Sequence, residues 1–225
     1  MTKILAIDQS TSATKALLFE SDGTLLDSVS TPHQQYYPQA GWVEHDAEEI
    51  WKGVLKLLKK AIKTGGLDAS KALGIGITNQ RETTVLWDRA SGTPLANAIV
   101  WQCRRTADVC ESLKQAGHTE LVRAKTGLVI DAYFSGTKIA YLLDHIPDAR
   151  QRASRGELCA GTIDSWLLYK LTGQFATEYT NASRTLLYNI ETKSWDPELL
   201  EIFNVPREVL PDVKPSRCHF GSTTN

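Results

Sequence analysis

The chain has 225 residues, of which 42% are hydrophobic, and its 25 basic and 26 acidic side chains give a formal net charge of −1. This length and apolar content suffice for one large domain or two small ones, and the near-neutral charge disfavours nucleic acid as a partner, because that partner requires a broad basic surface. No apolar run approaches the roughly 18 residues that a membrane span requires, and the N-terminus lacks a signal-peptide pattern.

The start of the chain predicts three strands in succession. Residues 3–7 form a short apolar run that ends at Asp8, residues 13–19 form a second run, and residues 24–30 follow an Asp-Gly hairpin turn. Three consecutive strands predict an antiparallel meander.

A helix is expected next. Asp46, with Glu49 three residues later, is typical of a helix start. Apolar residues then recur at positions 50, 54, 58 and 62 with helical spacing, and Gly65-Gly66 ends the pattern.

Residues 78–82 form a run of five polar residues between two apolar runs, 73–77 and 83–87, each of which reads as a strand. Burying this much polarity beside core strands costs free energy unless each group has a partner. One interpretation is a solvated hairpin loop. The other is a ligand site, in which the Arg81 guanidinium and the Glu82 carboxylate are fixed side by side at the end of a sheet.

The rest of the chain predicts one more strand and several helices, and no convincing closing element is expected beyond Val205. The strand covers residues 98–101, and the helices cover 104–115, 118–125, 135–145 and 162–173, with a last one beginning at Asp196-Pro197-Glu198 because proline suits the first helical position. Strands interspersed with helices predict an α/β fold.

The cysteines and histidines give no sign of a disulfide framework or a metal site. No C-x-x-C spacing is present, so reduced thiols in a cytoplasmic protein are expected. The five histidines are scattered without metal-ligand spacing. The sequence also lacks the common nucleotide-binding glycine motifs and the G-x-S-x-G motif.

Asp8 is the first candidate site residue. A carboxylate at the end of a strand, followed by a turn of hydroxyl residues, can hold Mg²⁺ directly or through water, and Thr11, Ser12 and nearby backbone amides can meet phosphate oxygens. The alternative is a turn in which Asp8 bonds to its own backbone.

A second group of candidates has the chemistry of a hydroxyl-binding site. Arg81 and Glu82 supply rigid donors and a strong acceptor pair, the Trp101 indole offers a flat apolar face, and Tyr133 in the turn before residues 135–145 offers a phenol. The alternatives are a loop salt bridge, a core tryptophan and a helix-capping turn. These residues indicate a sugar- or polyol-related phosphotransferase.

Several stretches are similar to one known family. The chain resembles the N-terminal domain of glycerol kinases, within the carbohydrate kinases that include xylulokinase and gluconokinase. The run from Asn79 to Thr83 and the run from Trp101 to Thr106 are particular to the glycerol branch. The stretches that carry the resemblance are residues 8–11, 41–46, 76–84, 100–106, 126–131, 133–138 and 179–185.

The resemblance implies an actin-like ATPase (ribonuclease H-like) fold, a mixed sheet flanked by helices, and an ATP- and Mg²⁺-dependent enzyme that converts glycerol to sn-glycerol 3-phosphate. It leaves a homo-oligomer of the full-length protein open. It also implies a role for each candidate. Those that would hold the glycerol are Arg81, Glu82, Trp101 and Tyr133. Those that would serve the nucleotide are Asp8 near the Mg²⁺, with Thr11, Ser12 and Lys15 at the phosphates.

Two departures from the family stand out. Glycerol kinases usually have Gly, Ser and Arg where this chain has Ser10, Ala13 and Lys15, which bears on nucleotide geometry. The family's catalytic base lies in a Gly-Asp-Gln motif that is absent from these 225 residues. Residues 1–225 are therefore expected to be the N-terminal substrate-binding domain of a two-domain kinase, truncated before the nucleotide domain and inactive in isolation.

Three alternatives stay open. The first is a related kinase for a longer polyol or a ketose. The second is a nuclease on the same fold that uses Asp8, Asp131 and Asp164 around two metal ions, although the near-neutral charge does not supply the basic surface that it would need. The third is a non-catalytic binding module with an actin-like fold.

Overall fold

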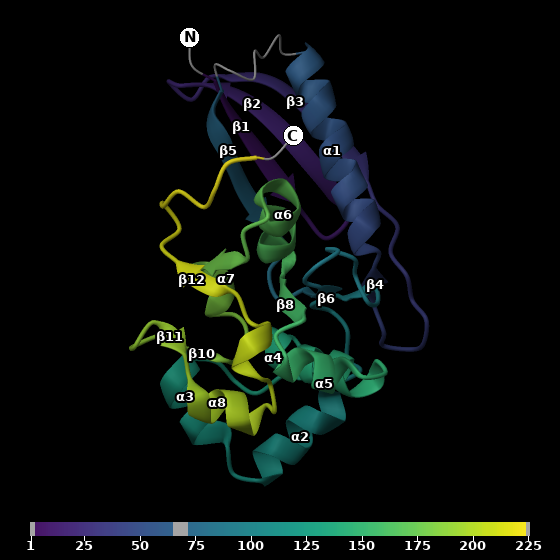
Figure 1. Ribbon diagram of the computed structural model, residues 1–225, viewed down its shortest axis with the longest axis vertical. Helices are drawn as coiled ribbons and strands as arrows, with labels where there is room; N and C mark the ends of the chain where they lie inside the picture. Colours follow the sequence, from purple (N-terminus) through teal and green to yellow (C-terminus); the bar gives the residue numbers. More distant parts are fainter. Residues whose placement is uncertain (1–2, 65–71, 224–225) are drawn as a thin grey trace. The chain divides into compact units, whose positions relative to one another are not determined.

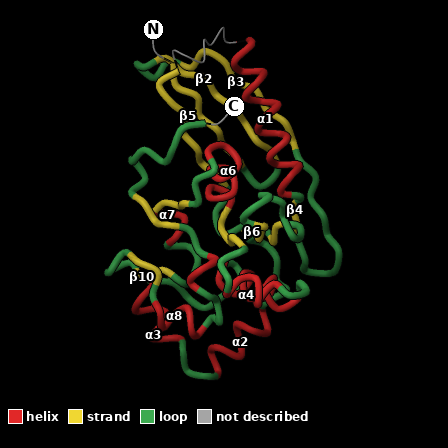
Figure 2. Tube along the Cα trace, in the orientation of Figure 1, coloured by secondary structure: helices red, strands yellow, loops and turns green. Residues whose placement is uncertain are grey.

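The computed structural model describes residues 3–64 and 72–223. They form two compact units (Figure 1). Unit 1 comprises Met1–Gln35 and His45–Gln80, and unit 2 comprises Tyr36–Glu44 and Arg81–Asn225. Figure 2 shows that unit 1 consists of long strands with one long helix, whereas unit 2 alternates short strands with helices.

Unit 1 is a mixed sheet with the strand order β3-β2-β1-β5. The predicted meander is confirmed, because β1 pairs antiparallel with β2 and β2 pairs antiparallel with β3. The fourth strand, β5, lies parallel to β1. The strands are β1 (Lys3–Gln9), β2 (Ala13–Glu20), β3 (Leu25–Pro32) and β5 (Ala72–Asn79).

The helix α1 (Ala47–Thr64) contacts β2 and β3. Its Ile50 and Val54 are buried, as are Leu5 on β1 and Leu18 on β2. Asp46 caps the helix as predicted, since its Oδ1 accepts the backbone N–H groups of Glu48 (2.8 Å) and Glu49 (3.2 Å). The predicted Gly65-Gly66 stop lies outside the described residues.

Unit 2 is built around a second sheet with the strand order β4-β7-β6-β8. Strand β6 pairs antiparallel with both β7 and β8, and the helices α4 and α6 contact it. The strands are β4 (Glu44–His45), of which only Glu44 belongs to unit 2, β6 (Thr84–Asp88), β7 (Ala98–Ile99) and β8 (Leu158–Thr162). The helices that lie between or after them are α2 (Ala107–Gln115), α3 (Thr119–Thr126), α4 (Ser135–His145), α5 (Ala149–Ser154), α6 (Ile163–Thr172), α7 (Tyr179–Ala182) and α8 (Pro197–Ile202).

Two small ladders complete unit 2. Strand β9 (Ala176–Glu178) pairs parallel with β12 (Asp212–Lys214), and β10 (Tyr188–Asn189) pairs antiparallel with β11 (Ser194–Trp195). After Val205 the chain forms a 3₁₀ turn, Arg207–Val209, and then β12, neither of which the sequence predicted.

The interpretation of residues 78–82 as a hairpin loop is wrong. The strands on either side of this run, β5 and β6, belong to two different sheets and do not pair with each other. The chain passes from unit 1 to unit 2 between Gln80 and Arg81. The polar run is therefore a connection between units.

Two boundaries also differ from the prediction. The strand expected over residues 98–101 ends at Ile99, so Trp101 lies in the turn that follows it, and the helix expected from Arg104 begins at Ala107. In the turn before α2, the Arg104 backbone N–H donates to the Gly41 carbonyl (2.8 Å). In the part of the chain that the structure describes, no helix has the length and apolar character to cross a membrane.

Candidate substrate and phosphate sites

The phosphate-site candidates of unit 1 gather at the turn between β1 and β2. Asp8 pairs in register with Lys15 on the neighbouring antiparallel strand, which places the two side chains beside each other on one face of the sheet. Asp8 is partly buried and Lys15 is exposed. The Ser10 hydroxyl donates to Asp8 Oδ1 (3.1 Å). This face therefore carries a carboxylate, an ammonium and hydroxyls together.

Serine at position 10 does not strain the turn. No positive φ is found at Ser10, and its N–H bonds to the Ala13 carbonyl (2.9 Å) in an ordinary tight turn. The cost that would follow from replacing a left-handed glycine therefore does not arise. Thr11 is partly buried and Ser12 is exposed at the tip of the same turn, as contact with a phosphate requires.

A buried polar network that the sequence did not reveal lies behind this turn. Gln80, at the end of β5, donates through Nε2 to Gln9 Oε1 (3.0 Å) and to the Ser10 carbonyl (3.3 Å). The same nitrogen lies 3.3 Å from His45 Nδ1. Because all three side chains are at least 93% buried, the network holds the turn and the end of β5 in one arrangement.

His45 is the only side chain of that network that can carry a charge, and it is neutral at pH 7. Burial, and then the neighbouring His33, lowers the pKa of His45 to about 3, and the two rings meet edge to face with their centroids 4.6 Å apart. The histidines of this unit therefore support the turn without adding charge to it.

Glu82 is the most constrained residue among the hydroxyl-binding candidates of unit 2. Its backbone adopts φ = 63°, a left-handed conformation that is uncommon for residues other than glycine. Its carbonyl accepts the hydroxyls of Ser135 (3.0 Å) and Thr84 (3.1 Å), which hold it in that conformation. The side chain is 5% exposed. Such over-determined strain is characteristic of functional positions.

Arg184 is a member of this cluster to which the sequence assigned no role. Its Nε donates to Glu82 Oε1 at 2.6 Å. Its guanidinium carbon lies 4.9 Å from the centroid of the Phe134 ring and 5.7 Å from that of Tyr133. Arg184 therefore fixes the Glu82 carboxylate and contacts the turn that carries the phenol. The only signal in the sequence was its place in the stretch 179–185.

Trp101 and Tyr133 lie together, with ring centroids 5.3 Å apart. The backbone N–H of Trp101 donates to Thr83 Oγ1 (3.3 Å). Asp131 fixes the Tyr133 turn, since its Oδ1 accepts both the Tyr133 N–H (2.8 Å) and Arg104 Nη1 (2.6 Å). Burial raises the pKa of Asp131, but these two donors outweigh it, so that the pKa lies below the ordinary value.

The structure thus brings Glu82, Trp101 and Tyr133 into one cluster with Arg184. Arg81 is exposed at the start of the same unit. The phosphate-site candidates lie in unit 1. The eight candidates therefore form two sets, one in each unit.

The other acids considered for a metal site have partners of their own. Asp131 is paired with Arg104, and burial raises the pKa of Asp164, which accepts the hydroxyls of Thr162 and Thr177. Within residues 3–64 and 72–223, no group of three or more His, Cys, Asp or Glu side chains is arranged to hold a metal ion.

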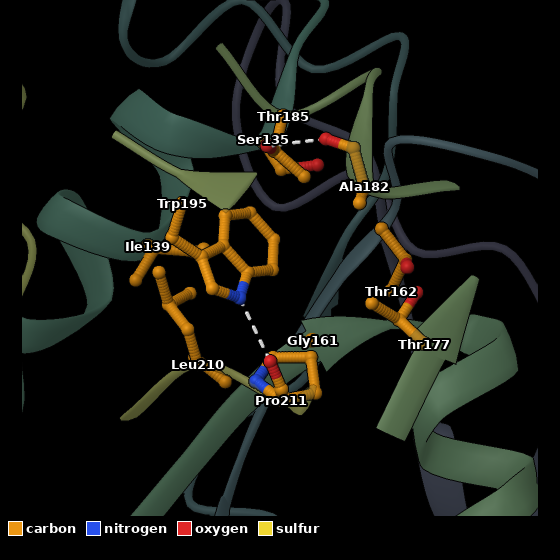
Figure 3. Close-up of a pocket in the computed structure, with 11 residues that line it drawn as sticks. Ser135, Ile139, Gly161, Thr162, Thr177, Ala182, Thr185, Trp195, Leu210 and Pro211 are labelled. Atoms are coloured by element: carbon orange, nitrogen blue, oxygen red, sulfur yellow. Dashed lines mark hydrogen bonds between the residues drawn. The ribbon is translucent and has the colours of Figure 1, made fainter. Parts of the chain in front are cut away.

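The interior of unit 2 has no room for a polyol at its small cavity. Ser135, Ile139 and Trp195 line this cavity (Figure 3), whose volume is about 10 Å³. The Trp195 indole N–H donates to the Pro211 carbonyl at 2.8 Å. Such a cavity holds at most about one water molecule. This cavity is therefore not a polyol-binding site, and none of the four hydroxyl-binding candidates lines it.

Comparison with known proteins identifies the class to which this fold and these residues belong. Over residues 3–225 the chain matches the N-terminal domain of the FGGY family of carbohydrate kinases. The chain belongs to this family. The expected actin-like ATPase fold, a mixed sheet flanked by helices, is confirmed.

Within this family, the chain is more similar in sequence to two glycerol kinases than to a xylulose kinase. The chain is 56% identical to the glycerol kinase of Alcanivorax borkumensis, over 99% of this chain and 45% of that protein. It superposes on the crystal structure of Plasmodium falciparum glycerol kinase with ADP at a TM-score of 0.94 and 37% identity, over 100% of this chain and 45% of that one. A ligand-bound xylulose kinase from Lactobacillus acidophilus shares the fold at a TM-score of 0.84 and 24% identity, over 95% and 42% of the two chains. The chain spans about half the length of these relatives.

Proposed function

We propose that residues 1–225 are the N-terminal, substrate-binding domain of a two-domain, ATP-dependent glycerol kinase, which forms sn-glycerol 3-phosphate. The observation that carries the proposal is the cluster in which a fixed carboxylate, a phenol and an indole lie together around Arg184. The 56% identity to a glycerol kinase supports the choice of glycerol over other acceptors. The share of the relatives' length that the chain covers supports the two-domain arrangement.

In this proposal the cluster binds the acceptor. The Glu82 carboxylate accepts hydrogen bonds from glycerol hydroxyls, while Arg81 and the Tyr133 phenol donate to them. The Trp101 ring covers the carbon backbone. Because Arg184 and Ser135 hold Glu82 before the substrate arrives, little conformational freedom is lost on binding.

The turn of unit 1 would serve the nucleotide. Asp8 would lie at the Mg²⁺, and Thr11, Ser12 and Lys15 would meet the phosphates. The pairing of Asp8 with Lys15 and the unstrained turn fit this role. When bound, Mg²⁺ neutralises phosphate charge, and the rate would depend mainly on positioning and charge stabilisation, as is usual for phosphoryl transfer.

A cytoplasmic location is part of the proposal. All four cysteines are free, and three of them are buried. Free buried thiols suit a reducing compartment.

A coupled assay of ATP consumption tests the function. The full-length kinase that carries this chain is expected to phosphorylate glycerol with a much higher kcat/KM than erythritol or xylulose. The 225-residue chain alone is expected to give no turnover, because it lacks the Gly-Asp-Gln motif. Preference of the full-length protein for xylulose or erythritol would overturn the assignment of glycerol as the substrate. Turnover by the 225-residue chain alone would overturn the proposal that catalysis requires a second domain.

A further inference from the structure

Lys138, on α4, is a fully buried lysine, with 0% of its surface exposed. Removing an ammonium from water costs several kcal/mol even after the protein relaxes. An apolar side chain of similar volume would fill the same space without that cost. The hydrogen-bond partners of the Lys138 amine therefore indicate the role of this buried lysine.

Within the described residues, the hydrogen bonds of the amine are made to the turn that carries the phenol. Nζ donates to the carbonyl of Tyr133 (2.5 Å) and to the carbonyl of Phe134 (3.0 Å). These are two consecutive residues immediately before α4. The ammonium thus holds two neighbouring peptide groups from inside the core.

The same turn is fixed from its outer side by Asp131, which accepts the Tyr133 N–H and pairs with Arg104, 52% of whose side chain is exposed. Lys138 and Asp131 therefore hold the two polar groups of the Tyr133 backbone, the carbonyl and the N–H. With both fixed, the direction in which the Tyr133 side chain leaves the backbone is fixed as well.

We propose that Lys138 is a positioning residue that aims Tyr133, and through it the Trp101 face, at the acceptor polyol. This inference rests on the proposed function, because it assigns Lys138 to the binding of glycerol. Lys138 does not touch the substrate. It acts through the two carbonyls.

The surroundings of the amine agree with this role. Burial lowers the pKa of Lys138 to about 7, against the opposing influence of Cys103, Glu82, Cys110 and Asp131. Charge-assisted hydrogen bonds are about twice as strong as neutral ones. The hydrogen bonds from Lys138 to the two carbonyls are therefore strongest below pH 7, where the amine is protonated, and they weaken as the pH rises through that value.

The test compares Lys138→Met with wild type in the full-length kinase. The expected result is a rise of about tenfold in KM for glycerol, with KM for ATP and kcat each changed less than twofold. Lys125→Met is the matched control, since Lys125 lies in the same unit and bonds only Asp196 and Glu198 among the partners seen in the described residues. It should leave KM for glycerol unchanged. General loosening of the unit would instead alter both variants.

If wild type phosphorylates glycerol and Lys138→Met keeps its KM for glycerol, the positioning role is wrong while the proposed function stands. If wild type does not phosphorylate glycerol, the proposed function itself fails. Should Lys138→Met not fold, Lys138→Gln, which keeps a donor without the charge, takes its place. A severalfold rise in KM for glycerol between pH 6.5 and pH 8.5 in wild type, without a rise in KM for ATP, supports the role, and the same rise in the variant overturns it.

Discussion

Replacing Glu82 with glutamine in the proposed full-length glycerol kinase is expected to lower kcat/KM for glycerol by roughly 10- to 150-fold. Glutamine keeps the shape of the side chain but removes its charge, and a hydrogen bond to a charged group is worth roughly 1.5–3 kcal/mol. The carboxylate is 5% exposed and bonded to Arg184 at 2.6 Å. Water therefore cannot replace the lost interaction, and Arg184 loses its partner as well.

The measurement is steady-state kinetics with glycerol as the varied substrate. Glu120→Gln, an exposed glutamate on α3, is the control and should behave as wild type. A kcat/KM for Glu82→Gln within twofold of wild type would show that Glu82 is not an acceptor ligand.

Replacing Arg105 with methionine is expected to lower the free energy of unfolding by about 2–4 kcal/mol. The Arg105 side chain is 5% exposed and pairs with Glu44 at 2.6 Å. Its guanidinium carbon lies 3.8 Å from the Trp42 ring centroid and 5.3 Å from that of Tyr141. Removing one partner of a buried ion pair leaves the other charge uncompensated, at a cost of about 3–5 kcal/mol. Asn97 still donates to Glu44, which reduces that cost.

Urea unfolding of the chain measures this effect. The neighbouring Arg104→Met is the control, because its guanidinium is 52% exposed and exposed ion pairs contribute at most about 1 kcal/mol. Equal losses in the two variants would mean that the buried pair has no special weight in the stability of unit 2.

Local pattern was enough to predict the elements whose partners lie close in sequence. The meander of β1, β2 and β3 follows from alternating burial and tight turns, and α4 has the predicted bounds, Ser135–His145. Strand β8 was missed because every residue of Leu158–Thr162 is buried, which removes the alternation that marks a half-exposed strand.

Pairing across long stretches of chain could not be read from the sequence. The apolar runs on both sides of residues 78–82 were correctly expected as strands, but nothing local shows that β5 and β6 join different sheets. Arg184 lies 102 residues from Glu82 in the chain, and the sequence assigned no role to Lys138, the last residue of the stretch 133–138. Both cations could be linked to Glu82 and Tyr133 only once the fold was known. The strained φ of Glu82 is likewise a property of its surroundings.

The indole resonances of the full-length protein, labelled with ¹⁵N and titrated with glycerol, test most directly whether this cluster is the acceptor site. The chain contributes six tryptophans, and Trp101→Phe identifies the resonance of Trp101. We expect this resonance to shift on addition of glycerol, with a midpoint that matches KM for glycerol, and we expect Glu82→Gln to move the midpoint to higher concentration. An unmoved Trp101 resonance at glycerol concentrations that saturate the enzyme would show that the cluster is not the acceptor site.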